Sequence, residues 1–109
     1  MFKAMILLTR RADMTHGDFV DWWLADHAPR AALLPGARRV VFNVVEPSAP
    51  EAGIDGISEL WFDSQEAFEA AYATEIGRAV AADSMAHVSG RVRLFVGEHD
   101  LEGLDPVRS

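Results

Sequence analysis

The stretch "WWLADHAPRAALLPG", residues 22–36, starts as an amphipathic helix and then interrupts its own pattern. At about 100° per residue, one side of this helix is apolar apart from a single histidine, and it is formed by Phe19, Val20, Trp23, Leu24 and His27. Pro29 has no N–H for the carbonyl of Ala25, so we expect the regular helix to end or kink near His27. A break there would let the imidazole reach past the helix end and transfer protons at neutral pH. The alternative is that His27 only caps the helix, because the helix dipole favours a cation at that end.

The rest of the chain predicts the element order β-α-β-β-α-β. Alternating or continuous apolar patterns predict four strands, at residues 2–9, 38–46, 57–62 and 87–96. Serine, threonine and aspartate precede the helical patterns, with Thr15 and Asp18 in capping-box spacing, Asp63 or Ser64 before a second helix, and Thr74 before a further helical piece. This order predicts an α+β, ferredoxin-like fold, a four-stranded antiparallel sheet with the helices on one face. We expect residues 1–99 to form one domain and residues 100–109 a tail.

Composition excludes several classes of protein. The chain has 109 residues, half of them apolar, which suffices for one compact core. A net charge of -7, with no basic cluster beyond Arg10-Arg11 and Arg38-Arg39, argues against nucleic-acid binding. No apolar run approaches the roughly 20 residues that cross a bilayer, and residues 4–8 are too short for the core of a signal peptide. We therefore expect a cytoplasmic protein that binds no membrane.

One face of the predicted sheet has a mixed character. In the last strand we expect the valines and leucine at 88, 92, 94 and 96 to lie under the helices, which leaves Arg91, Arg93 and Phe95 on the other face with Glu59 and Trp61. That face is too apolar for water and too charged for an ordinary core. A second copy of the chain packed over it would form a homodimeric barrel, with a small-molecule pocket inside. The alternative is a monomer whose sheet face is solvated.

Two segments resemble the EthD family of the dimeric α/β-barrel superfamily: "MTHGDFVDWWLADHAPRAALLPGARRVVFN", residues 14–43, and "DGISELWFDSQEAF", residues 55–68. The resemblance implies a cofactor-independent barrel dimer that acts on small, often aromatic or lactone-like metabolites. It also implies that His27 is the proton-transfer candidate. Many members carry a tyrosine shortly after the "PG-x-R-R" motif, where this chain has Val40. If that tyrosine donates a proton in relatives, this protein must use another group or another reaction.

The candidate catalytic residues are His27 and Glu59, and the candidate substrate-binding residues are Trp23, Asn43, Trp61, Arg91, Arg93 and Phe95. Glu59 could orient His27, act as a base with a raised pKa, or form an ion pair with Arg91 or Arg93, and we favour the ion pair. The two arginines could bind a carboxylate or enolate oxygen, or form salt bridges across the dimer. The four histidines show no metal-binding spacing and no nucleotide-binding glycine motif is present, so we expect no metal and no cofactor.

These features predict a cofactor-free lyase, isomerase or cyclase of a catabolic or polyketide-type pathway. In it, His27 would move a proton on a carbonyl, lactone or aromatic substrate, and Arg93 or Asn43 would stabilise the developing oxyanion. Two alternatives stay open. One is a non-catalytic accessory or binding protein of a degradation operon, and the other is a cofactor-free monooxygenase.

Overall fold

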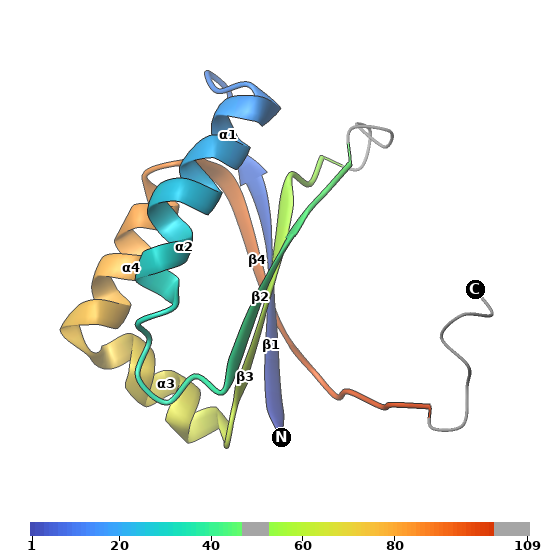
Figure 1. Ribbon diagram of the computed structural model, residues 1–109, viewed down its shortest axis with the longest axis vertical. Coiled ribbons are helices and arrows are strands. Elements are labelled where there is room, and N and C mark those ends of the chain that lie inside the picture. The colour runs from blue at the N-terminus through green and yellow to red at the C-terminus, as the bar shows by residue number, and fades with distance from the viewer. Residues whose placement is uncertain (47–52, 102–109) are drawn as a thin grey trace.

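The computed structural model describes residues 1–46 and 53–101, and in these ranges the chain follows the predicted order (Figure 1). The elements are β1 (Phe2–Arg10), α1 (His16–Trp22), the π-helical turn η1 (Trp23–His27), α2 (Ala28–Ala31), β2 (Arg39–Val44), β3 (Gly56–Phe62), α3 (Gln65–Ala73), α4 (Glu75–Met85) and β4 (Val88–Val96). Most of the predicted tail, residues 100–109, lies outside the described residues.

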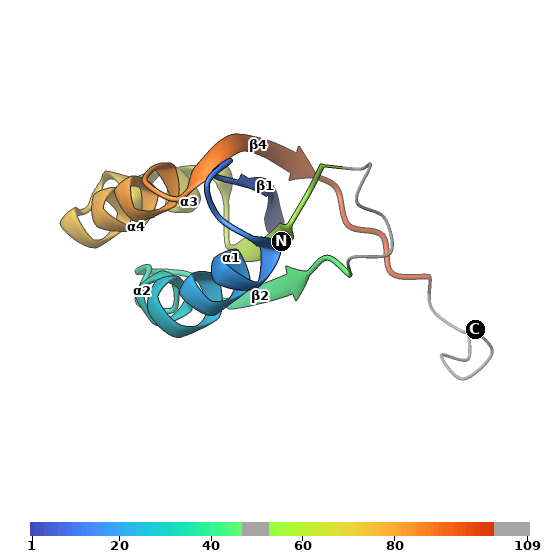
Figure 2. The ribbon, with the colours of Figure 1, turned by 90° about the horizontal axis from the view of Figure 1, so that it is seen from above.

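The four strands form one antiparallel sheet in the order β2-β3-β1-β4. All the helices lie against the same face of it, as the two perpendicular views show (Figures 1 and 2). The predicted α+β, ferredoxin-like class is therefore confirmed. Within one chain the sheet is open, with β2 and β4 as its two edges, so a closed barrel would require a second sheet.

The predicted helix starts are fixed by side-chain caps. Thr15 and Asp18 form the expected capping box, in which each side chain accepts a hydrogen bond from the other residue's backbone N–H. Ser64, rather than Asp63, caps α3 by accepting from the backbone of Ala67. Thr74 separates α3 from α4 and caps α4, so the predicted helical restart is also present.

The helix around His27 is interrupted where Pro29 predicts, but the chain stays helical there. In η1 the backbone N–H of Ala28 donates to the carbonyl of Trp23, the spacing of a π-helical turn, and α2 continues to Ala31. Such a wider turn absorbs the missing N–H of a proline without ending the helix. It also changes which side chains point inward, because Trp22 is buried and Leu24 is 46% exposed, opposite to our expectation for Leu24.

The core lies between the sheet and the helices. The sheet contributes to this core the alternate residues of β1 and β3, namely Ala4, Ile6, Leu8, Leu60 and Phe62. Trp23 is completely buried and stacks on Phe42, with 4.4 Å between ring centroids. Its ring also covers Gly56, where a Cβ atom would come within 2.7 Å of it, so only glycine fits at the start of β3.

The facing of β4 differs from our expectation. Directly paired residues of antiparallel strands share a face, and Arg91 and Arg93 pair with Leu8 and Ile6 of the core face. Arg91 and Arg93 therefore lie on the side that the helices cover, whereas Val92 and Leu94 point to the open side and are 51% and 44% exposed.

The cause of this inversion is a register shift near the start of β4. Thr9 pairs with Gly90, but the next residue of β1, Arg10, pairs with Val88, so β4 contains one extra residue between them. Such a β-bulge reverses the alternation of the strand beyond it. Val88 accordingly packs against the core, as expected, while Val92, Leu94 and Val96 do not lie under the helices.

Candidate active site

A pocket lies between the helices and the sheet of a single chain. It contains about 330 Å³ of empty space, counting the part that is open to solvent. The space is narrow and admits on the order of one water molecule, so a larger ligand must displace some of the lining side chains. Most of the walls are apolar, and the lining residues are Ile6, Leu8, Trp23, His27, Ala31, Phe42, Ser58, Leu60, Tyr72, Val80, Ala81, Ser84 and Arg91.

The imidazole of His27 is held at both nitrogens. Its Nδ1 lies 2.8 Å from Oδ2 of Asp83, and its Nε2 lies 3.2 Å from Oγ of Ser84. Since a carboxylate only accepts hydrogen bonds, Nδ1 of His27 carries the proton and donates it to Asp83. The lone pair is then on Nε2, where it accepts the hydroxyl of Ser84. This arrangement orients a basic nitrogen within the lining of the pocket.

Burial lowers the pKa of His27 below that of an exposed histidine, since the side chain is almost completely enclosed. The hydrogen bond and the charge of Asp83 act in the opposite direction and favour the imidazolium form, while His87 and Arg30 lower the pKa further. The net effect keeps His27 neutral at pH 7, which is the state a general base requires.

Asp83 is itself held in place by groups from α1, from α2 and from the turn between α4 and β4. The indole Nε1 of Trp22 donates to it at 3.4 Å, Nε of Arg30 lies 3.9 Å from Oδ2, and Nδ1 of His87 lies 3.6 Å from Oδ1. His87 also stacks on the ring of Trp22 at a centroid distance of 4.1 Å. Asp83 can therefore fix the ring orientation of His27 and stabilise its positive charge after it takes up a proton.

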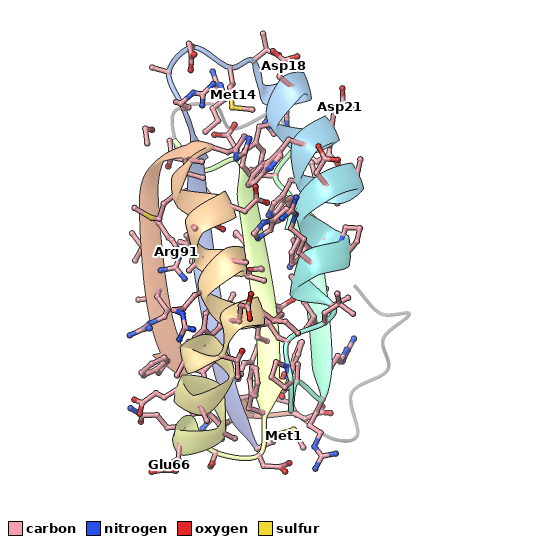
Figure 3. All side chains as sticks on the ribbon, turned by 90° about the vertical axis from the view of Figure 1, so that its left-hand side faces the viewer. Met1, Met14, Asp18, Asp21, Glu66 and Arg91 are labelled. Carbon is pink, nitrogen blue, oxygen red and sulfur yellow. The ribbon has the colours of Figure 1, made fainter. Side chains whose placement is uncertain are left out.

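Two further polar groups line the pocket, from α3 and from β4. Burial raises the pKa of the Tyr72 hydroxyl, so this group keeps its proton and is a hydrogen-bond donor. Burial lowers the pKa of Arg91, although a guanidinium stays charged at neutral pH. Figure 3 shows Arg91 on β4 beside α4, on the side of the sheet that carries the helices. The pocket thus combines one base with two donors that can stabilise an oxyanion.

The structure brings together some of the predicted site residues. His27, Trp23 and Arg91 line the same pocket. Arg93 and Phe95 lie on the same face of β4 but outside the lining, where the guanidinium of Arg93 is 4.8 Å from the centroid of the Phe95 ring. Their predicted contacts with substrate stay predictions.

Glu59, Asn43 and Trp61 lie on the opposite face of the sheet from His27. Glu59 forms an ion pair with Lys3 at 2.8 Å and accepts a hydrogen bond from Asn43 at 3.0 Å. The expected pairing of Glu59 with Arg91 or Arg93, and its contact with His27, are therefore wrong, because the sheet separates them. Its pKa is lowered, mainly by Lys3, instead of raised. A pocket closed by a second copy over the face that carries Glu59 would not contain His27, for the same reason.

Sequence reasoning missed three polar residues of the pocket region, Asp83, Ser84 and Tyr72. One signal was available, because Ser84 stands four residues after Val80 and so shares the buried side of α4. A serine on an otherwise apolar helix face requires a hydrogen-bond partner. No comparable signal exists for the pairing of Asp83 with His27, which are 56 residues apart.

Within residues 1–46 and 53–101, no group of three histidine, aspartate or glutamate side chains is arranged to hold a metal ion. Among the helices of the described chain, none has both the length and the apolar character needed to cross a membrane.

Residues 11–90 match the family model of the EthD domain. The solved structures that are similar in fold include three that cover about nine tenths of this chain. An EthD family protein from Bacillus halodurans is 22% identical, with 91% of this chain and 100% of that chain covered and a TM-score of 0.77. A dimeric ferredoxin-like protein from Thermobifida fusca is 18% identical, with coverages of 89% and 90% and a TM-score of 0.74. A hydroxynitrile lyase from Passiflora edulis is 13% identical, with coverages of 91% and 95% and a TM-score of 0.70. None of the curated proteins matches this chain.

Proposed function

Because the chain belongs to the EthD family and holds a neutral, buried histidine in an apolar pocket, we propose that it is a cytoplasmic, cofactor-independent enzyme that moves a proton on a small organic substrate. The reaction class is that of a lyase, isomerase or cyclase in a catabolic or polyketide-type pathway. The observation that carries this proposal is the hydrogen-bonded chain from Asp83 through His27 to the pocket.

In the proposed mechanism, a substrate carbonyl lies near Arg91 and Tyr72, and the acidic C–H or O–H of the substrate displaces the hydroxyl of Ser84 from Nε2 of His27. Nε2 of His27 removes a proton from the carbon next to the carbonyl or from a hydroxyl group. Asp83 stabilises the imidazolium that forms, and the guanidinium and phenol stabilise the negative oxygen. Return of the proton to another atom of the substrate, or its transfer from His27 to a departing leaving group, completes the reaction and restores the neutral imidazole. Many members of the family carry a tyrosine where this chain has Val40, and in this mechanism Tyr72 would supply that phenol instead.

The test is exchange of carbon-bound hydrogen for deuterium in D2O, followed by NMR over a panel of ketones, lactones and cyanohydrins. The wild type is expected to accelerate exchange or conversion of at least one compound by about 10²–10⁴ over the His27→Asn variant. His99→Asn, which changes an exposed histidine, is the matched control and should behave as wild type.

Three outcomes count against the proposal. If His27→Asn is as active as wild type, the role assigned to His27 is wrong. If compounds of the panel bind tightly without exchange or conversion, a non-catalytic binding protein is favoured. Oxygen uptake in step with substrate loss would favour a cofactor-free monooxygenase.

We also propose that two copies associate through the open face of the sheet, the side without helices. This open face has apolar side chains that are partly exposed in the single chain, among them Met5, Leu7, Val41, Ile57, Val92 and Leu94. Lys3 lies buried among them between Glu59 and Glu98, at 2.8 and 3.1 Å. Apolar side chains gathered on one face mark a protein interface.

Light scattering after gel filtration tests the dimer. The wild type is expected to have twice the mass of the chain, and Leu94→Asp, which places a charge on the open face, is expected to shift it to monomer. Leu33→Asp is the matched control, because Leu33 is 65% exposed and lies in the segment after α2. A monomeric wild type, or a dimer that Leu94→Asp leaves intact, would contradict this association.

A further inference from the structure

The lining of the pocket contains hydrogen-bond donors that have no acceptor among the described residues. Arg91 is half-buried in its lining, and no acidic side chain of the described residues forms a salt bridge with it. The indole Nε1 of Trp23, also a lining residue, is a buried donor for which the described residues offer no acceptor. The pocket's histidine acceptor, Nε2 of His27, is already occupied by Ser84.

A half-buried guanidinium without an anion is unfavourable, because it loses hydration and gains no partner. The chain as a whole carries a net charge of -7, so acidic side chains were available for pairing. Arg93 adds a second positive charge two residues away on the same face of β4, and it too forms no salt bridge within the described residues. This local excess of positive charge is suited to an anionic ligand.

The chemistry of the walls selects among anions. A guanidinium offers two parallel N–H donors, which match the two oxygens of a carboxylate. A phosphate carries up to two charges and more oxygens, and the remaining walls of this pocket are largely apolar. A neutral amide would leave the positive charge of Arg91 without a partner.

We propose that the substrate is a small carboxylate whose anionic group binds to Arg91, with the indole N–H of Trp23 as a second donor. The rest of the substrate would then lie against the apolar wall, toward His27. This inference uses the pocket of the proposed function and adds the chemical class of the substrate. It also assigns Arg91 a role in binding the ground state, besides any role in stabilising an oxyanion.

Benzoate, benzamide and phenyl phosphate are suitable probes, since they share a ring and differ in the charged group. Each is titrated into 15N-labelled protein while the side-chain Nε–Hε signal of Arg91 and the indole signal of Trp23 are followed by NMR. Benzoate is expected to shift both signals and to bind at least about tenfold more tightly than the other two compounds. Equal or tighter binding of benzamide or phenyl phosphate would overturn the proposal.

Variants assign the binding to one arginine. Arg91→Gln is expected to weaken benzoate binding about tenfold or more. Arg91→Lys keeps the charge but lacks the two parallel N–H donors, so its affinity for benzoate should lie between those of Arg91→Gln and wild type. Arg38→Gln is the matched control, because Arg38 is an exposed arginine that pairs with Asp63 outside the lining, and it should bind benzoate within about threefold of wild type. Unchanged affinity in a folded Arg91→Gln variant would overturn the assignment.

The same titration on His27→Asn separates this inference from the proposed function. Retained benzoate binding together with lost proton exchange supports both. Retained binding with full exchange would overturn the role of His27 and leave the carboxylate site standing. Benzoate that fails to bind the wild type, while exchange still depends on His27, would overturn the carboxylate site alone.

Discussion

Replacing Asp83 with asparagine removes the charge beside His27 and keeps nearly the same shape. The two side chains are 2.8 Å apart and only 5% and 15% exposed, so water screens their interaction little. An asparagine oxygen can still accept from Nδ1, but the imidazolium loses the attraction of a full negative charge, and an opposite charge within about 4–6 Å typically shifts a pKa by about 1–3 units. A difference of about 1.4 kcal/mol corresponds to one pKa unit. We therefore expect Asp83→Asn to lower the pKa of His27 by about one unit further.

The measurement is a pH titration of the 15N-labelled imidazole by NMR, which requires no substrate. It reports both the pKa and which nitrogen of His27 carries the proton, expected to be Nδ1 in the wild type. Asp63→Asn is the matched control, because Asp63 pairs with Arg38 at 2.8 Å on the exposed surface and should not affect His27. A His27 pKa that is unchanged or raised in Asp83→Asn would refute the pairing on which the proposed base depends.

Two further predictions concern stability. Because burial lowers the pKa of His27 in the folded protein, the unfolded chain binds a proton there first, near pH ~6.5. Wild-type stability should therefore fall as the pH drops below about 6.5, by up to about 1.4 kcal/mol per unit, and His27→Asn should lack this component in urea unfolding at several pH values. Gly77→Ala would place a Cβ atom in steric conflict with the carbonyl oxygen of Ala71 and with Cα of Tyr72, both of them backbone atoms. It should cost about 1–3 kcal/mol, whereas Gly17→Ala, whose nearest contact is 3.8 Å, should be close to neutral or stabilising in the same assay.

Local signals predicted most of the fold. Alternation assigned the faces of β3 correctly, since Leu60 is buried under the helices while Glu59 and Trp61 lie on the other face, as expected. Caps at Thr15 and Thr74 fixed two helix starts, because a side-chain acceptor for free backbone N–H groups is a strictly local requirement. These features depend on residues a few positions apart, which a single sequence contains.

The side of the sheet that holds the site was not predictable in the same way. Alternation in β4 separates two sets of side chains but does not say which set faces the helices, and the bulge between Val88 and Gly90 reversed the expected answer. As a result Arg91 was placed with Glu59, although the two lie on opposite faces. A bulge is a property of the pairing between two strands. The sequence of the bulged strand therefore indicates it only weakly, here by a glycine at position 90.

The π-helical turn explains why a proline follows the histidine so closely. The hydrogen bond of this turn joins residues five positions apart instead of four. The side chains of Trp22, Trp23 and His27 therefore point inward together. Trp23 can then cover Gly56, while Trp22 donates to the same carboxylate of Asp83 that orients His27. Pro29 favours this arrangement, since it cannot supply the N–H that an unbroken α-helix would need at that position. The interruption of the helix is therefore a part of how the site is built: it brings the base to its carboxylate and anchors both beside the core.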